Sequence, residues 1–275
     1  MRNIFKRLAR LVKVAAYRRR APLHLEFVVS DYCNLNCRGC THYSALAPKQ
    51  FQPIDQLRRT AARLGAVCGD GIEAAYLIGG ETLLYPDLTE AMEILRHNFP
   101  FQQLYVYTNG IMLSGMSPEF WQTAHRLHFT IALTRYPINF DYDSAERLCR
   151  ERGVEVKVIA DRGEENSFFR FALDREGRQN AMVSHFKCYH FGCISVIGDR
   201  IYPCPISGCS GHLNRAFGTG FEHRPGDWLE VENVDDLRQI RRLRDKPVPF
   251  CRYCKLSPAS VPYGPSACDP SEWVD

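Results

Sequence analysis

The chain has 275 residues, of which 45% are hydrophobic and 24% charged, and its formal net charge is +4 at pH 7. This is the composition of a soluble globular protein, long enough to bury a sizeable core as one domain with an appendage or as two small domains. Many of the basic residues lie in the first twenty positions and the remainder is slightly acidic, which argues against a general nucleic-acid-binding surface.

Twelve cysteines occur without a secretory signal, several of them in CxxxCxxC and CxxC spacings. This pattern favours metal ligation in a reducing compartment over a disulfide framework, so we expect a cytoplasmic protein. Arg10 and Lys13 interrupt the candidate apolar core of a signal peptide. No stretch reaches the ~18 apolar residues of a transmembrane helix.

Residues 1–20 predict a basic amphipathic helix, because apolar residues recur near helical spacing with arginines and lysines between them. Such a helix can lie on an anionic membrane surface, which would give the protein peripheral membrane contact. It can equally pack against the outside of the folded domain. The sequence leaves both interpretations open.

Strand-forming runs alternate with amphipathic stretches through residues 21–180. The predicted strands are 23–29, 74–78, 103–107, 129–133 and 154–159, with a further candidate at 168–173, and the predicted helices are about 54–67, 87–98, 118–127 and 143–152. This alternation predicts an α/β fold of parallel strands with right-handed crossovers. Six strands are too few for a complete eight-stranded barrel.

The first predicted strand leads into a loop with three cysteines, Cys33, Cys37 and Cys40, in the spacing CxxxCxxC. Cysteine thiolates are the usual ligands of a [4Fe–4S] cluster, one for each iron, so three cysteines leave one iron open. Asn34, Asn36 and Gly39 tolerate the turns that direct three nearby side chains to one centre. The spacing resembles the signature of the radical S-adenosylmethionine (SAM) enzymes.

In that family, the open iron is chelated by the amino and carboxylate groups of SAM, which is cleaved to a 5′-deoxyadenosyl radical. The resemblance implies a partial (βα)6 TIM-like barrel over residues 21–180, in agreement with the alternating pattern. It also implies a reductant such as flavodoxin or ferredoxin. Taken alone, the cysteine loop would also suit a structural zinc or ferredoxin-like site.

A second motif, Gly79-Gly80-Glu81, follows the second predicted strand. It resembles the family's GGE motif, whose backbone and glutamate bind the amino group of SAM, although Thr82 stands where a proline is usual. Two glycines let the main chain approach a ligand closely, and a carboxylate can accept hydrogen bonds from an ammonium group. We therefore expect these three residues to bind the cofactor.

Polar residues also follow the third and fourth predicted strands, at the rim where this architecture carries its chemistry. Asn109 ends the third strand, and Thr134-Arg135-Tyr136 ends the fourth. The resemblance implies that Asn109 and Thr134 contact SAM and that Arg135 is a catalytic residue. Asn109-Gly110 would also suit an ordinary tight turn.

Residues 181–275 hold a second group of cysteines, on either side of a predicted hairpin that turns at Gly198-Asp199. The five candidate ligands are Cys188, Cys193, Cys204, Cys251 and Cys254. Four thiolates complete a cluster or a zinc site. The arrangement resembles the twitch domain, a shortened SPASM domain that carries one auxiliary [4Fe–4S] cluster.

Five cysteines compete for four ligand positions, so the choice between Cys188 and Cys193 stays open, although the spacing to Cys204 favours Cys188. Cys193 would then be a free thiol, and we predict it as a catalytic hydrogen-atom donor. Four further cysteines have no predicted role as ligands: Cys68, Cys149, Cys209 and Cys268.

The resemblance implies hydrogen abstraction from a hydroxyl-bearing carbon of a small-molecule or glycan substrate, followed by epimerisation or alcohol oxidation. Radical modification of a ribosomally synthesised peptide is a competing hypothesis. A short segment precedes Cys33, less than a leader-peptide-binding domain needs, which favours the small substrate. Two more hypotheses are an activase acting on a protein partner and an iron–sulfur or zinc interaction protein without SAM chemistry.

Overall fold

The computed structural model describes Arg18 and residues 21–161, 167–256 and 258–275. Apart from Arg18, the predicted basic helix of residues 1–20 lies outside the described residues, and its membrane contact stays a prediction. Within the described ranges, no helix has both the length and the apolar character needed to cross a bilayer.

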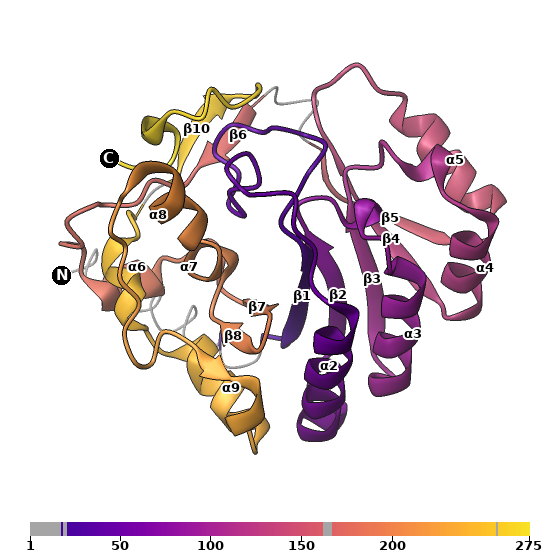
Figure 1. Cartoon of the computed structure of the whole chain (residues 1–275), viewed down its shortest axis with the longest axis horizontal. Helices are drawn as coiled ribbons and strands as arrows, with labels where there is room; N and C mark the ends of the chain where they lie inside the picture. Colours follow the sequence, from indigo (N-terminus) through magenta and orange to yellow (C-terminus); the bar gives the residue numbers. More distant parts are fainter. Residues whose placement is uncertain (1–17, 19–20, 162–166, 257) are drawn as a thin grey trace, which may run out of the picture.

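One eight-stranded sheet forms the centre of the protein, with the strand order β5-β4-β3-β2-β1-β7-β8-β9 (Figure 1). Its first five strands are parallel neighbours: β1 (His24–Ser30), β2 (Ala74–Gly79), β3 (Gln103–Thr108), β4 (Phe129–Arg135) and β5 (Glu155–Asp161). On the other side of β1, β7 (Cys193–Ile197) is also parallel, whereas β8 (Arg200–Tyr202) and β9 (Leu229–Glu230) are antiparallel.

Four helices cover one face of this sheet: α2 (Ile54–Cys68), α3 (Leu88–Asn98), α4 (Pro118–Arg126) and α5 (Tyr142–Glu151). Alternate residues of β1, including Leu25 and Phe27, point into the core beneath them and are fully buried. The opposite, inner face carries a separate cluster that includes Tyr76, Tyr105 and Ala132. The predicted partial barrel of parallel α/β units is therefore confirmed.

The predicted sixth barrel strand at 168–173 is wrong. The strand found there, β6 (Ser167–Arg170), pairs with β10 (Ala259–Pro262) in a separate antiparallel ribbon. A sixth strand of the barrel would lie beside β5, but β5 is the edge strand of the described sheet, and the strand beside β1 is β7, whose Ile194 and Val196 are fully buried. A strand-forming run shows that a segment can pair, but its partner is decided by the rest of the chain.

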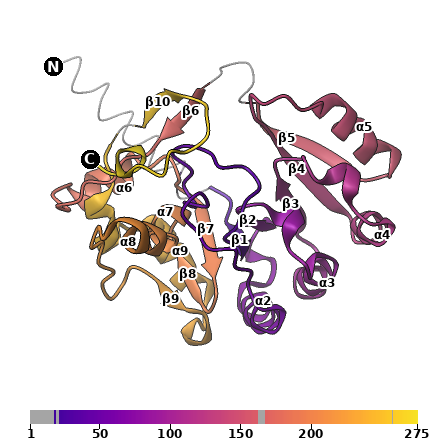
Figure 2. The same cartoon turned by 45° about the horizontal axis from the view of Figure 1, so that its top comes forward.

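The predicted hairpin is confirmed: β7 and β8 are antiparallel, and Gly198 takes the positive φ of +57° at the turn. The remaining helices of the C-terminal half are α6 (Ala181–Phe186), α7 (Pro205–Gly208), α8 (Gly211–Phe217) and α9 (Leu237–Asp245) (Figure 2). Because β7 to β9 extend the sheet of the barrel, one sheet runs across the predicted boundary at residue 180. The division into domains stays a prediction.

The C-terminal strap, residues 263–275, returns over the cysteine loop that follows β1. The Arg38 N–H donates to the Gly264 carbonyl at 3.0 Å, and the Ser266 N–H donates to the Asn36 carbonyl at 2.6 Å. The Trp273 indole donates to the Cys40 carbonyl at 3.0 Å. Figures 1 and 2 show this yellow segment beside the indigo loop. The strap fixes the backbone of the loop from the side opposite the sheet.

Candidate active site

All three cysteines of the CxxxCxxC loop line one cavity of about 220 Å³ at the carboxyl ends of β2, β3 and β4. The cavity also includes four of the predicted SAM contacts, Gly79, Gly80, Asn109 and Thr134. The structure thus brings together residues from four separate loops at the rim of the barrel, where parallel α/β folds carry their sites.

Hydrogen bonds hold the cysteine loop in this position. The Leu35 N–H donates to the Cys33 sulfur at 3.3 Å, and the Asn109 amide donates to the Asn34 side chain at 2.7 Å. Gly39 has a positive φ of +71°, a conformation that favours glycine. Asn109 therefore has a structural role in positioning the loop in addition to lining the cavity.

The donor set of this loop fits an iron–sulfur cluster. Burial raises the pKa of the Cys33 thiol, and burial beside Cys40 raises the pKa of Cys37 to about 12. Thiols in such surroundings ionise at neutral pH only if a cationic centre compensates the buried negative charge. Three cysteines around one cavity suit a [4Fe–4S] cluster with one iron left for another ligand.

The two glycines of the GGE motif permit a close approach between two backbone segments. The Gly80 N–H donates to the Ser30 carbonyl at 2.7 Å, and the Glu81 N–H donates to the Tyr32 carbonyl at 2.9 Å. A Cβ atom added at Gly80 would lie 2.3 Å from the Tyr32 oxygen. The sequence predicted close approach to a ligand, and the structure shows that the same glycines are needed to seat the start of the cysteine loop.

Glu81 is buried and accepts three hydrogen bonds from its own protein. The donors are the Leu83 N–H at 2.9 Å, the Thr108 hydroxyl at 2.6 Å and the Asn109 N–H at 2.9 Å. Burial raises the pKa of this carboxyl and the hydrogen bonds oppose that rise. The carboxylate therefore ties the end of β2 to the end of β3, and Gly79 and Gly80 are the motif residues found in the cavity lining.

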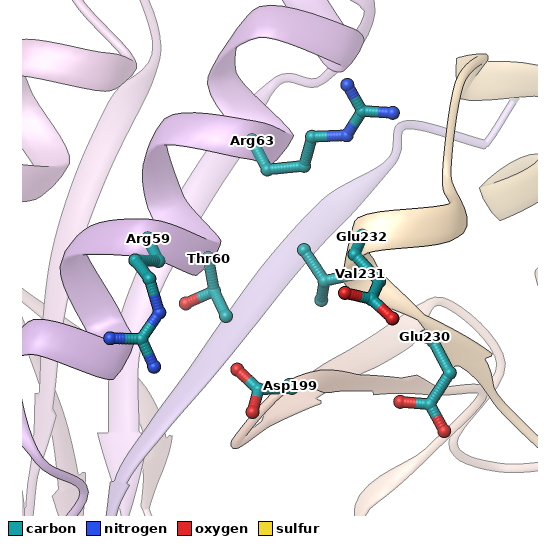
Figure 3. Close-up of a pocket in the computed structure, with 7 residues that line it drawn as sticks. All are labelled: Arg59, Thr60, Arg63, Asp199, Glu230, Val231 and Glu232. Atoms are coloured by element: carbon teal, nitrogen blue, oxygen red, sulfur yellow. The ribbon is translucent and has the colours of Figure 1, made fainter.

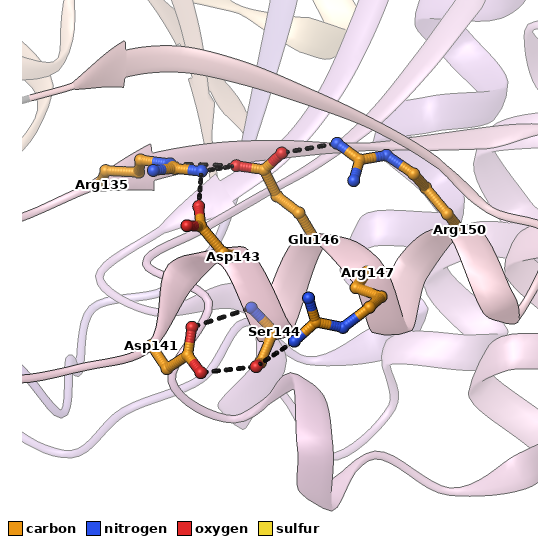
Figure 4. A network of polar contacts seen from close by, with 7 residues as sticks. All are labelled: Arg135, Asp141, Asp143, Ser144, Glu146, Arg147 and Arg150. Carbon is orange, nitrogen blue, oxygen red and sulfur yellow. Dashed lines mark hydrogen bonds and ion pairs between the residues drawn. The ribbon is translucent and has the colours of Figure 1, made fainter.

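Arg135 occupies a different position from the one predicted. Its guanidinium pairs with Asp143 at 2.7 Å and with Glu146, both on α5, and Glu146 also accepts from Arg150 (Figure 4). Among the described residues lining the cavity, Thr134 and Tyr136 are present and Arg135 is absent. Its side chain links β4 to α5, so this geometry does not support a catalytic role.

His42, two positions after the last loop cysteine, also lines the cavity. Its Nε2 is buried without a hydrogen-bond partner among the described residues, and burial lowers its pKa to about 4, so the imidazole is neutral. A buried polar atom without a partner is costly unless a ligand satisfies it.

The C-terminal cysteines meet at a second cavity, which Cys188, Cys204, Cys251 and Cys254 line together. Among the described residues of this lining, Cys193 is absent. Burial raises the pKa of all four thiols, that of Cys251 to about 11. The arrangement favours Cys188 over Cys193 as the fourth member of the set.

No group of three or more His, Cys, Asp or Glu side chains in the described part of the chain is placed to hold a single metal ion. Thiolates that bind the separate irons of a cube stand further apart than the ligands of one tetrahedral ion. The fit of both cysteine sets to clusters therefore rests on their shared cavities and on the chemistry of buried thiols.

Cys193 lies on the inner wall of the barrel beside Glu26, a residue that the sequence analysis missed. Burial raises the pKa of Glu26 to about 7, against the opposing effect of hydrogen bonds from Cys193 and Ser195. The Ser195 hydroxyl lies 3.3 Å from the carboxylate. Burial and the neighbouring Glu26 in turn raise the pKa of the Cys193 thiol, which keeps its proton at neutral pH.

A larger cavity of about 600 Å³ lies on the outside of the protein, between α2 and the segment after β8 (Figure 3). Its lining includes Arg63, Asp199 and Glu230. These charges already have protein partners: Arg63 pairs with Asp235, Asp199 accepts from Gln56 at 2.8 Å, and Glu230 pairs with Arg200 at 2.9 Å. Both sets of cysteines lie outside this large cavity. We therefore place the active site at the cavity lined by Cys33, Cys37 and Cys40.

Residues 27–161 match the family described as the Radical SAM superfamily, a range that includes the end of β1, the cysteine loop, the GGE motif and β2 to β5. The chain belongs to the radical SAM superfamily. As a member, it is expected to bind a [4Fe–4S] cluster and SAM, and the cavity at Cys33, Cys37 and Cys40 provides the place for both.

Among curated proteins, the chain is 31% identical over 105 residues to a GTP 3′,8-cyclase of Klebsiella pneumoniae subsp. pneumoniae, a match that covers 37% of this chain and 31% of the relative. The chain thus spans about a third of the length of the curated relatives it matches.

Among solved structures, BtrN in complex with AdoMet and 2-DOIA has a TM-score of 0.52 at 16% identity, covering 86% of this chain and 94% of BtrN. This likeness concerns the fold. The match to Streptococcus suis SuiB has a TM-score of 0.39 at 19% identity and covers 56% of this chain and 36% of SuiB.

We predict that Gly80→Ala prevents assembly of the first cluster. The added methyl group would displace the Tyr32 backbone and the cysteine loop behind it, so the iron bound after anaerobic reconstitution should fall by about four atoms per chain. Gly115→Ala is the matched control, because a Cβ atom there has nothing within 4 Å. Wild-type iron content in Gly80→Ala would contradict this account of the motif.

Glu26→Gln should change how stability depends on pH. A carboxyl whose pKa is raised from 4.5 to about 7 in the folded state stabilises the fold below pH 4.5 and loses that stabilisation as the pH rises through 7. The loss corresponds to roughly 3 kcal/mol. Chemical denaturation at pH 5 and pH 8 should therefore show Glu26→Gln gaining stability relative to wild type at the higher pH. Glu119→Gln, at an exposed position, is the control. A difference in unfolding free energy between Glu26→Gln and wild type that does not change with pH would refute the prediction.

Proposed function

We propose that this radical SAM enzyme removes a hydrogen atom from a hydroxyl-bearing carbon of a small-molecule or carbohydrate substrate and oxidises the alcohol. One observation carries the proposal: Cys188, Cys204, Cys251 and Cys254 line a single cavity beside the barrel. Four buried thiols fit an auxiliary [4Fe–4S] cluster, as in a twitch domain. In an oxidation, this second redox centre would accept the electron that the substrate radical loses.

When bound, SAM and the first cluster supply the 5′-deoxyadenosyl radical, and the auxiliary cluster supplies a one-electron acceptor. The protein contributes the surroundings. Gly79, Gly80, Asn109 and Thr134 line the cavity that would hold SAM. The concave inner face of the sheet provides the walls that hold the substrate and limit the access of water.

We assign Glu26 as the base that accepts the proton of the substrate hydroxyl. Oxidation of an alcohol to a ketone removes one hydrogen atom, one proton and one electron, so it needs a base as well as the two redox groups. Glu26 lies on the inner wall, and its pKa of about 7 suits proton transfer at neutral pH.

A second candidate reaction, epimerisation, is favoured by the position of Cys193. The thiol lies on the inner wall and outside the lining of the auxiliary cavity, and its raised pKa keeps the S–H bond intact. A protonated thiol can return a hydrogen atom to the opposite face of the substrate carbon. The proposal also includes a cytoplasmic location and reduction by a flavodoxin or ferredoxin.

Iron counting after anaerobic reconstitution tests the assignment of the cysteines. The wild type should bind about eight irons and form 5′-deoxyadenosine from SAM and dithionite. Cys37→Ala should abolish this cleavage, whereas Cys251→Ala should retain about four irons and some cleavage. Cys193→Ala should keep all the iron, as should the control Cys149→Ala, which changes a buried cysteine of α5. Loss of four irons from Cys193→Ala would assign Cys193 as a ligand.

Product analysis in D2O separates the candidate reactions, with aminocyclitols and nucleotide sugars as probes. Oxidation predicts a ketone, which forms in Cys193→Ala and forms more slowly in Glu26→Gln. Epimerisation predicts deuterium at the inverted carbon, which disappears in Cys193→Ala. A new thioether or carbon–carbon crosslink in a peptide, with no product from the alcohol probes, would overturn both.

A further inference from the structure

The hydroxyl of Tyr263 lies 3.4 Å from the sulfur of Cys37, within hydrogen-bonding distance for sulfur. Cys37 is the most buried of the three loop cysteines, with 6% of its surface exposed, whereas Cys33 and Cys40 are half-buried. Tyr263 comes from the C-terminal strap, more than two hundred residues further along the chain. It is therefore a contact that the folded protein brings to the cluster site.

The strap fixes this hydroxyl in place. Pro265 forms an isolated antiparallel bridge with Cys37, and the backbone hydrogen bonds of Gly264 and Ser266 lie on either side of it. The Tyr263 ring also packs against Tyr136 at 5.7 Å and Phe168 at 6.2 Å between ring centroids. The side chain is held by its backbone and by its ring, which limits the position of its hydroxyl oxygen.

The direction of the hydrogen bond follows from the chemistry of the sulfur. A cysteine that binds iron is a thiolate and has no hydrogen to donate, so the tyrosine must be the donor. A hydrogen bond to a cluster sulfur withdraws negative charge from the ligand. It therefore favours the reduced cluster, which carries one more electron, and raises its reduction potential.

We propose that Tyr263 is a positioning residue that raises the reduction potential of the [4Fe–4S] cluster at Cys33, Cys37 and Cys40 through its hydrogen bond to Cys37. The inference rests on membership of the radical SAM superfamily and does not depend on the substrate. A second donor, the Leu35 N–H on Cys33, belongs to the backbone. The Asn109 amide also contacts the Cys33 sulfur, at 3.9 Å, but Asn109 lines the cavity. Tyr263 gives the shorter side-chain contact, at 3.4 Å, and a substitution can remove it without changing a residue of the cavity lining.

The test is a redox titration of the reconstituted full-length enzyme without SAM, followed by electron paramagnetic resonance. The signal of this cluster is identified in a parallel sample as the one that changes when SAM is added. Tyr263→Phe removes the hydroxyl and keeps the ring, so we expect the equilibrium constant for reduction to fall by about three- to tenfold. A tenfold fall corresponds to ~59 mV for a one-electron couple.

Tyr85→Phe is the matched control, because it removes a buried tyrosine hydroxyl that donates to the Gln52 carbonyl at 2.7 Å and lies outside the cavity lining, and it should leave the potential within a factor of two. A wild-type potential in Tyr263→Phe with full iron content would overturn the proposal. If that variant loses iron, 3-fluorotyrosine at position 263 keeps the donor and makes it more acidic, and the potential should rise. Failure of that rise would also overturn the proposal. Absence of SAM cleavage would instead count against the proposed function.

Discussion

The structure depends on how the chain gathers three cysteines around one cavity at the end of β1. Burial raises the pKa of the Cys33 and Cys37 thiols, so these two ionise at neutral pH only beside a cationic centre. A loop of this kind also needs external support, since it forms neither a helix nor a strand. The protein provides it from two sides, through the GGE backbone at Ser30 and Tyr32 and through the C-terminal strap at Asn36, Arg38 and Cys40.

Cys33 and Cys193 lie toward opposite ends of β1. Cys33 follows the last residues of the strand, whereas Cys193 is in register with His24 at its start. The seven residues of β1 extend about 20 Å at ~3.3 Å per residue. Glu26 and Ser195 face one another between these ends. A substrate on the inner wall would therefore have the radical source toward one end and the Cys193 thiol toward the other.

Much of the fold could be predicted from the sequence, because local patterns determined it. The alternating runs located β1 to β5 and α2 to α5 to within a few residues, and Gly198 located the hairpin turn. The cysteine spacings selected the residues that line both cavities. These features depend on hydrophobic periodicity, cysteine spacing and turn residues, all of which can be read from residues close together in the sequence.

The features that the sequence did not predict depend on distant partners. Residues 168–173 have the composition of a barrel strand, but β10 pairs with β6 and β7 occupies the position beside β1. Arg135 follows a rim strand, yet its pairing with α5 directs it away from the cavity. Glu26 and Tyr263 belong to no motif, and they became candidates only when the fold placed them beside cysteines.

The central claim is that the cluster at Cys33, Cys37 and Cys40 holds SAM through its open iron. Electron–nuclear double resonance of the reduced enzyme with SAM labelled with ¹⁵N at the methionine amino group tests this directly. The account predicts a ¹⁵N hyperfine coupling to the cluster that persists in Cys251→Ala. A reduced cluster that shows no coupling to the labelled nitrogen, in enzyme saturated with SAM, would contradict it.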